Sequence, residues 1–188
     1  GADEATELRK APAAVTPAPL AAKILATRAS IEGERKQVTV LFADVKGSTA
    51  IIQGLDPEDA RALLDPLLTI MMDAVHKFEG TVNDVQGDGI MAIFGAPIAH
   101  EDHALRACRA AIAMQDMTRP DTDSDATDSD ARLRVGLHSG EVVVRAINND
   151  LTMSYSAVGV TTHLAARMEQ LAEPGTIRMS ADTHRLVR

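Results

Sequence analysis

Two aspartates stand where this sequence could hold a metal ion. Asp44 ends an apolar run of strand-forming residues, 38–43, and Asp88 lies between two glycines in the turn 87–89. A carboxylate at the mouth of a buried strand is costly to dehydrate unless a positive charge meets it. If that strand lies beside the turn, the two carboxylates come together and repel each other unless a proton or a metal ion intervenes. Hard oxygen ligands suit Mg²⁺ or Mn²⁺, and these ions suit a triphosphate.

The residues that follow Asp44 could bind an anion. Gly47, Ser48 and Thr49 precede an apolar segment, 50–52, and this order is typical of a turn that leads into a helix. The first N–H groups of a helix suit phosphate. The segment is not a P-loop, because its lysine precedes its glycine. The plainer alternative is that Asp44 caps a turn and Asp88 is an ordinary turn residue.

A histidine and an arginine form the third feature. His163 and Arg167 are four residues apart, so a helix would place them on one face, beside an apolar stripe. An arginine on the apolar side of a helix needs an anion or an acid as partner. The alternative is a surface arginine that pairs with Glu169 or with another acid.

Three other segments that could suggest a metal site or a reactive cysteine are better explained by structural roles. Residues 121–132 begin like a calcium loop, but the turn glycine and the closing glutamate are both replaced. Residues 100–103 place a second histidine one position too early for HExxH, and a helix with acids in its first turn explains them. Cys108 lies among alanines and fits a small core residue.

Composition limits the class of protein. The chain has 188 residues, enough for one domain with a core, and 45% are hydrophobic. The formal charge of −8 and the 2% of aromatic residues argue against nucleic-acid binding. We find no apolar run that could span a membrane and no signal peptide, and the single cysteine fits a reducing cytoplasm. We therefore expect a cytoplasmic domain.

The elements that must position these residues follow from periodicity and turn signals. Residues 1–35 read as a flexible linker with a short amphipathic helix, and 36–188 as one domain. We expect strands at 37–44, two flanking 87–89 within 81–95, two in a hairpin over 133–147 that turns near Ser139-Gly140, one at 155–160 and one at 176–179. We expect helices from Asp56-Pro57 to Gly80 with a restart or kink at Pro66, at 101–117 and at 161–171, with a loop at 119–131. This order predicts an α+β fold, a sheet covered by helices.

Four blocks of the chain resemble, in order, those of class III adenylyl and guanylyl cyclase catalytic domains. They read FADVKGST, GTVNDVQGDGIMAIFG, VGLHSGEVV and YSAVGVTTHLAARME, and the resemblance covers residues 36–188. The wording AHEDHALRA and TTHLAARMEQ is similar to a bacterial subgroup in which this domain precedes an ATPase and repeat region. The resemblance implies a ferredoxin-like, palm-type antiparallel sheet and a head-to-tail homodimer with two sites at its interface.

The resemblance also implies a role for each matching residue. One chain would bind two divalent metals, Mg²⁺ or Mn²⁺, through Asp44, Asp88 and the carbonyl of Val45. Its amides at 47–49 would hold phosphate. The other chain would contribute Arg167 to the transition state, in which the ribose 3′-hydroxyl of ATP attacks the α-phosphate.

This chain departs from the family pattern at four places. Asp84 stands where adenylyl cyclases carry a base-reading lysine, and Ser156 occupies the partner base position. His163 replaces the ribose-orienting asparagine, and the later phosphate-binding lysine would lie beyond residue 188, as in a truncated domain. The first expectation is a cyclase that makes cyclic AMP. A cyclase that uses GTP, and a degenerate nucleotide-binding dimer that regulates attached domains, stay open as alternatives.

Overall fold

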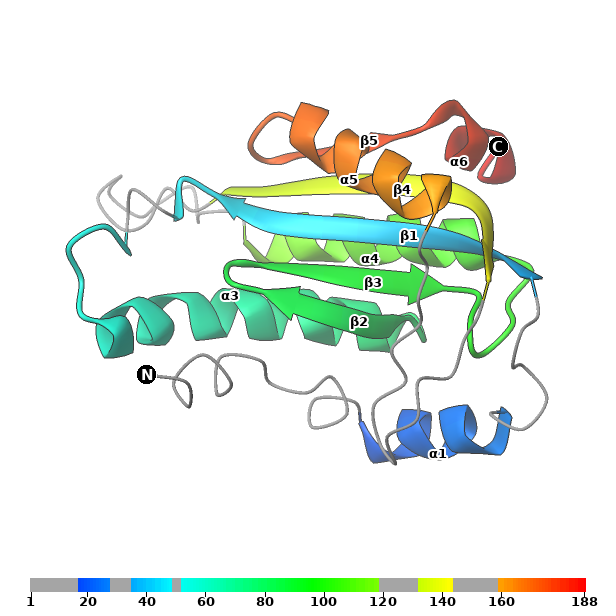
Figure 1. The fold of residues 1–188 in the computed structure, drawn as a ribbon, viewed down its shortest axis with the longest axis horizontal. Coiled ribbons are helices and arrows are strands. Elements are labelled where there is room, and N and C mark those ends of the chain that lie inside the picture. The colour runs from blue at the N-terminus through cyan, green and yellow to red at the C-terminus, as the bar shows by residue number, and fades with distance from the viewer. Residues whose placement is uncertain (1–16, 28–34, 49–51, 119–131, 144–158) are drawn as a thin grey trace.

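A five-stranded sheet forms the centre of the protein in a computed structural model, which describes residues 17–27, 35–48, 52–118, 132–143 and 159–188. The strand order is β2-β3-β1-β4-β5, and every pairing is antiparallel except that of β4 with β5. Figure 1 shows the long strands β1 and β4 side by side in the middle of the sheet. The strands are β1 (Arg35–Lys46), β2 (Thr81–Gln86), β3 (Gly89–Phe94), β4 (Arg132–Val143) and β5 (Thr176–Met179).

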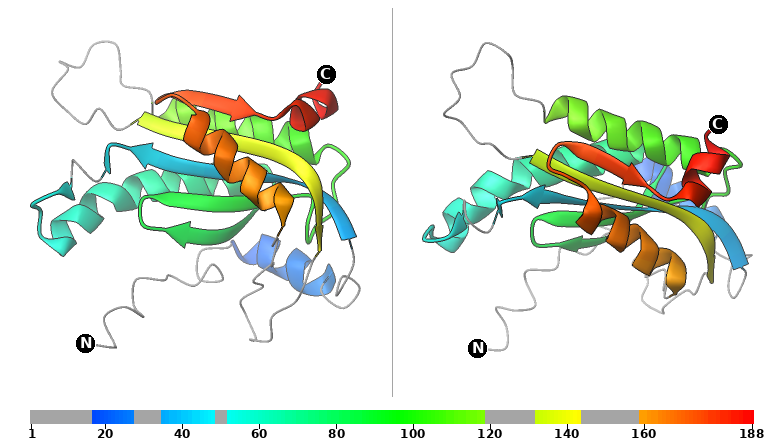
Figure 2. Two further views of the ribbon diagram at one scale, coloured as in Figure 1. Left: turned by 45° about the horizontal axis from the view of Figure 1, so that its top comes forward. Right: turned by 90° about the horizontal axis from the view of Figure 1, so that it is seen from above.

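Helices cover the two faces of the sheet unequally. The longer helices α3 (Pro57–Lys77) and α4 (His103–Met117) pack on one face, and α5 (Val160–Leu171) packs on the other. Figure 2 shows α4 and α5 on opposite sides of the sheet. The shorter helices are α1 (Ala18–Thr27) and α6 (Ala181–Leu186). No helix in these ranges is long and apolar enough to cross a membrane.

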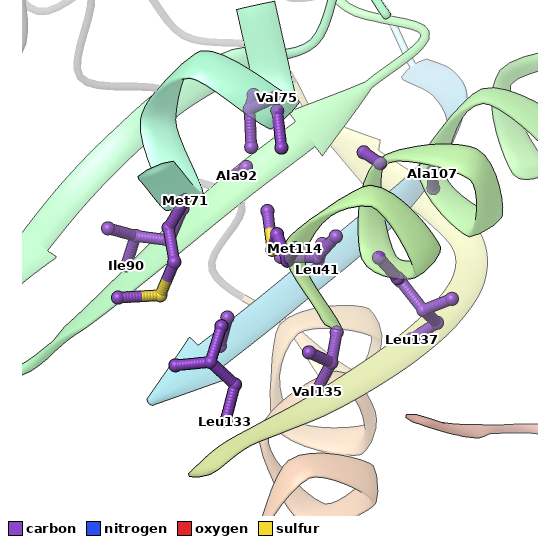
Figure 3. Packing of buried hydrophobic residues seen from close by; sticks show 14 of the residues in the cluster. Leu41, Met71, Val75, Ile90, Ala92, Ala107, Met114, Leu133, Val135 and Leu137 are labelled. Carbon is purple, nitrogen blue, oxygen red and sulfur yellow. The ribbon is translucent and has the colours of Figure 1, made fainter. Parts of the chain in front are cut away.

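Alternation along the strands separates a core face from a site face. In β1, Leu41 and Val45 belong to the large cluster beneath α3 and α4, whereas Val38 and Val40 belong to a smaller cluster beneath α5. Side chains alternate because successive residues of a strand point to opposite faces. Figure 3 shows side chains of α3, α4 and the strands meeting in the large cluster. Asp44 follows the parity of Val38 and Val40, so it lies on the face of α5.

The hairpin expected over 133–147 is wrong. Residues 132–143 form the single strand β4, which pairs with β1 along its length, from Arg35 opposite Val143 to Lys46 opposite Arg132. Gly140 is not a turn residue. A Cβ there would lie 2.7 Å from Oγ1 of Thr161, so the glycine allows α5 to approach the sheet closely.

The remaining elements follow the sequence more closely, with smaller differences. The hairpin about Gly87-Asp88-Gly89 and the strand at 176–179 are confirmed. Helix α3 continues through Pro66, which is exposed, so water can satisfy the carbonyl that loses its partner. The strand expected at 155–160 is wrong at Val160, where α5 begins, and its earlier residues lie outside the described part. Helix α6 was not anticipated from the sequence.

Two predictions about α4 can also be judged. The helix starts at His103, two residues later than expected, which confirms a helix start near residues 100–103, but the expectation of acids in its first turn is wrong, because Glu101 and Asp102 precede the helix. Cys108 is buried in the core cluster, as expected. The acidic stretch 121–131 lies outside the described residues.

Candidate active site

Asp44 lies near the end of β1 between two neighbouring strands. It is opposite Gly89 of β3 on one side and opposite Arg134 of β4 on the other. Its carboxylate is a quarter exposed. The buried run that precedes it fixes the strand in the sheet, so the position of this acid is set by the core beneath it.

The β2–β3 turn brings Asp88 to the same place. The amide of Val45 donates a hydrogen bond of 3.2 Å to the carbonyl of Asp88, which joins the turn to β1. A Cβ on Gly89 would lie 2.7 Å from the carbonyl oxygen of Ala43, so only glycine permits this close approach. Asp44 and Asp88 both line one cavity of about 170 Å³. The structure therefore brings the two aspartates together.

The turn after β1 adds a hydroxyl to the site. Gly47 has φ of 81°, a left-handed conformation that favours glycine, and Ser48 is buried. The hydroxyl of Ser48 donates a hydrogen bond to Oδ2 of Asp88. Its side chain thus orients the second aspartate, whereas phosphate binding by the amides of this turn stays a prediction. Thr49 and Ser156 lie outside the described residues.

An arginine that the sequence reasoning missed is the direct partner of Asp44. Nε of Arg134 donates to Oδ1 of Asp44 over 3.0 Å, and Nη2 donates to Oδ2. The hydrogen bonds to Asp44 raise the pKa of Arg134 above its ordinary value, with help from the negative charges of Glu169 and Asp88, whereas burial opposes the rise. The one signal for this contact in the sequence is alternation, since Arg134 lies between the core residues Leu133 and Val135. Sequence alone does not reveal the register that places it opposite Asp44.

Glu169 completes a buried charge cluster beneath α5. Its Oε1 lies 2.7 Å from Nη2 of Arg134, but it accepts no aligned hydrogen bond among the described residues. Arg134 therefore satisfies Asp44 better than it satisfies Glu169. Burial, followed by the negative charge of Asp44, raises the pKa of Glu169 to about 7.

Helix α5 presents different residues to its two sides. Thr161, Ala165 and Glu169 are buried and recur every four residues, so they form the side that packs on β4. His163 and Arg167, also four apart, are exposed on another side. Within the described part of the chain Arg167 makes no ion pair, and Glu169 pairs with Arg134 instead. The alternative of an Arg167–Glu169 pair is therefore not what the structure contains.

Asp84 lies on the same face as Asp44 but outside the cavity. It pairs with Met91 just after a bulge in β2, and Met91 belongs to the cluster beneath α5. Nε2 of Gln86 donates a hydrogen bond of 2.5 Å to its Oδ2. The acid is half-buried.

The donor set fits a hard divalent cation. Asp44 and Asp88 offer carboxylate oxygens at one cavity, and Oε1 of Glu169 is buried nearby without a hydrogen bond. No group of three acidic, histidine or cysteine side chains that could hold a metal occurs in the described ranges. Mg²⁺ is commonly held by one or two carboxylates together with substrate phosphates, so two aspartates suffice. The guanidinium of Arg134, however, already engages one of them.

Comparison with known proteins identifies the family. Residues 32–188 match the model of the adenylate and guanylate cyclase catalytic domain. Adenylate cyclase 1 of Rhizobium meliloti (strain 1021) is 31% identical over 137 residues, which are 72% of this chain and 21% of that protein. The chain thus spans about a fifth of that relative's length.

Solved structures similar to this chain are catalytic domains of the same family. The adenylyl cyclase CyaB from P. aeruginosa aligns with a TM-score of 0.73 and 30% identity, covering 84% of this chain and 83% of that one. The guanylate cyclase domain of RhGC from Catenaria anguillulae, in complex with GTP, aligns with a TM-score of 0.71 and 29% identity, covering 82% and 84%. The chain belongs to the family of class III adenylyl and guanylyl cyclase catalytic domains.

Proposed function

We propose that this domain converts ATP into cyclic AMP and pyrophosphate with the help of Mg²⁺ or Mn²⁺. The observation that carries the proposal is the meeting of Asp44 and Asp88 at one cavity, on the fold of a cyclase catalytic domain. A relative and a structural neighbour of this chain are named adenylate or adenylyl cyclases. The solved neighbours include guanylate cyclases as well, so the choice of ATP over GTP rests on the name of the curated relative.

The described chain offers only part of a nucleotide site. Its cavity of about 170 Å³ is smaller than the roughly 300–1,000 Å³ of pockets that enclose a drug-sized ligand. Arg167 and His163 face outward from α5, away from the buried side of their own helix. The exposed apolar residues Val160, Leu164 and Leu171 on the same helix favour a protein contact there. A second copy of the chain, related by a two-fold axis, would supply the missing groups to each site.

The chemistry then divides between the two copies. A divalent cation supplies a lowered pKa for the ribose 3′-hydroxyl and neutralises charge on the phosphates. Asp44 and Asp88 would hold that cation through their carboxylate oxygens. The 3′-oxygen attacks the α-phosphorus, its proton passes to solvent, and the bond to the bridging oxygen of the β-phosphate breaks. Arg167 of the second copy donates hydrogen bonds to the charge that develops on the phosphate oxygens.

GTP is the second candidate substrate because of Asp84. A carboxylate can only accept hydrogen bonds, and guanine presents donors at N1 and N2, whereas N1 of adenine is an acceptor. Asp84 is oriented by Gln86 and lies on the site face. Its short side chain favours weak base discrimination, and ATP stays the first candidate because the curated relative is named an adenylate cyclase.

The test is a cyclic-nucleotide assay of the full-length protein with Mn²⁺ and either ATP or GTP. We expect turnover in the wild type and a loss of about 100-fold or more in Asp44→Ala and in Asp88→Ala, because each removes a ligand to the largest local charge. Asp73→Ala, an exposed acid on α3, is the matched control and should retain activity. An active wild type with equally active Asp44→Ala and Asp88→Ala variants would contradict the proposal. A wild type that binds nucleotide without turnover would indicate the regulatory dimer instead.

A further inference from the structure

Arg134 is hydrogen-bonded to the Asp44 carboxylate, which the proposed function assigns as a metal ligand. Two of its donors engage the two oxygens of Asp44, and the carboxylates of Glu169 and Asp88 lie within its electrostatic reach. Its side chain is 17% exposed. A charge that is partly withdrawn from water is stabilised by partners of opposite sign, and Asp44 and Glu169 supply them.

We propose that Arg134 is a tethered counter-ion for Asp44, which it neutralises in the metal-free chain and leaves for Glu169 when a divalent cation binds. The inference rests on the proposed function, in which Asp44 is a metal ligand. It assigns Arg134 and Glu169 as positioning residues, because they act through Asp44 and do not touch the substrate.

Competition between Arg134 and the cation follows from their shared target. The guanidinium and a metal ion would both approach the Asp44 oxygens, and two positive charges a few ångströms apart repel each other. Without the metal, removal of Arg134 would leave Asp44 and Glu169 as a buried pair of like charges. A metal ion that binds the Asp44 oxygens would therefore displace the guanidinium from them.

Glu169 is suited to receive the displaced guanidinium. Its Oε1 already lies 2.7 Å from Nη2 of Arg134 and lacks an aligned hydrogen bond in the described structure. The guanidinium carries five N–H donors, so a small rotation of the side chain can exchange one carboxylate for the other.

The backbone around Glu169 is fixed, so the exchange requires no movement of α5. A Cβ on Gly136 would lie only 2.0 Å from the backbone nitrogen of Glu169, which shows how closely α5 is seated on β4. Near the start of α5, the hydroxyl of Thr161 donates a 2.8 Å hydrogen bond to the carbonyl of Glu141 in β4. This bond holds the other end of the helix on the same strand. Glu169 is therefore a stationary acceptor.

The test measures binding of Mn²⁺ alone to the purified full-length protein by electron paramagnetic resonance, together with thermal unfolding in the presence of EDTA. Arg134→Gln should lower the metal-free melting temperature and raise Mn²⁺ affinity by about fivefold or more, the effect of one unit charge in a hydrated site. Arg134→Lys keeps the charge and should bind Mn²⁺ within about twofold of wild type. Glu169→Gln removes the acceptor and should weaken Mn²⁺ binding without lowering the metal-free melting temperature.

Weaker binding of Mn²⁺ by Arg134→Gln would overturn the inference, since it would mean that Arg134 only orients Asp44. If Arg134→Gln does not fold, Arg134→Lys and Glu169→Gln still decide. Equal Mn²⁺ affinity of Glu169→Gln and wild type would then overturn the inference. Failure of the proposed function has a different signature, namely equal Mn²⁺ affinity of Asp44→Ala and wild type.

Discussion

The two faces of the sheet are built from the same strands, but in the described part of the chain only the face of α5 combines apolar side chains with a cluster of charges. Beneath α3 and α4 the strands contribute buried apolar side chains such as Leu41 and Val135. Beneath α5 the neighbouring positions Asp44 and Arg134 meet Glu169 in a cluster of charges. Adjacent residues of one strand thus serve stability on one face and chemistry on the other. The core face holds the strands in register, and that register is what places the charges of the site face together.

The largest effect on stability is expected from the core face. Leu41 is completely buried, and Leu41→Ala should lower the free energy of unfolding by about 2–5 kcal/mol through lost burial and a cavity. Mn²⁺ affinity of the folded protein should stay the same. Urea denaturation followed by circular dichroism measures the change. Leu63→Ala, at an exposed position on α3, is the control and should change stability by about 0.5 kcal/mol or less. Equal effects of the two variants would break the comparison.

An intermediate effect is expected on the choice of base at the site face. Asp84→Lys should shift preference towards ATP over GTP by about 1–3 kcal/mol, the scale of one desolvated base contact, because lysine can donate to N1 of adenine. Competition between the two nucleotides in the wild type and in the variant measures the shift. Stability should change little, because Asp84 is only half-buried. An unchanged ratio of affinities would show that Asp84 does not face the base.

The last comparison concerns how stability depends on pH. Burial raises the pKa of Glu169 from 4.5 to about 7, so the folded chain takes up a proton that the unfolded chain has already released in this interval. The free energy of unfolding should therefore fall as pH rises from about 4.5 to about 7, by the contribution of this group. The free energy of unfolding of Glu169→Gln should fall less steeply over the same pH range. Parallel curves of the two proteins in urea denaturation at pH 5, 6 and 7 would contradict this assignment.

Local signals in the sequence predicted the parts of the fold whose causes are local. The turn at Gly87-Asp88-Gly89 was recognisable because a tight hairpin turn requires positive φ, which glycine adopts whatever its distant neighbours are. Gly87 has φ of 56°. Ser139-Gly140 has the composition of another turn, but Gly140 lies within a strand and leaves room for the side chain of Thr161 in α5. That contact exists only in the folded protein. A glycine that permits contact and a glycine that permits a turn are indistinguishable in a single sequence.

The candidate site divides in the same way. Asp44 was identifiable because an acid directly after an apolar strand is costly to dehydrate, and Asp88 because a hairpin turn beside that strand would bring a second carboxylate to it. Arg134 was missed because its importance comes from cross-strand register, and register depends on the packing of whole faces. Glu169 entered only the alternative interpretation, as one acid that could pair with Arg167, since helical spacing does not tell which side of α5 meets the sheet.

Complementation between two inactive variants tests most directly the claim that each site is shared by two copies of the chain. Asp44→Ala and Arg167→Ala should each be inactive, and refolding or co-expressing them in equal amounts should restore about a quarter of wild-type activity, because half of the dimers would be mixed and carry one intact site. Asp44→Ala with Asp88→Ala is the matched control and should stay inactive, since both lesions fall on the same side of the interface. Given an active wild type and proven subunit exchange, absence of recovery in the first mixture would contradict the account.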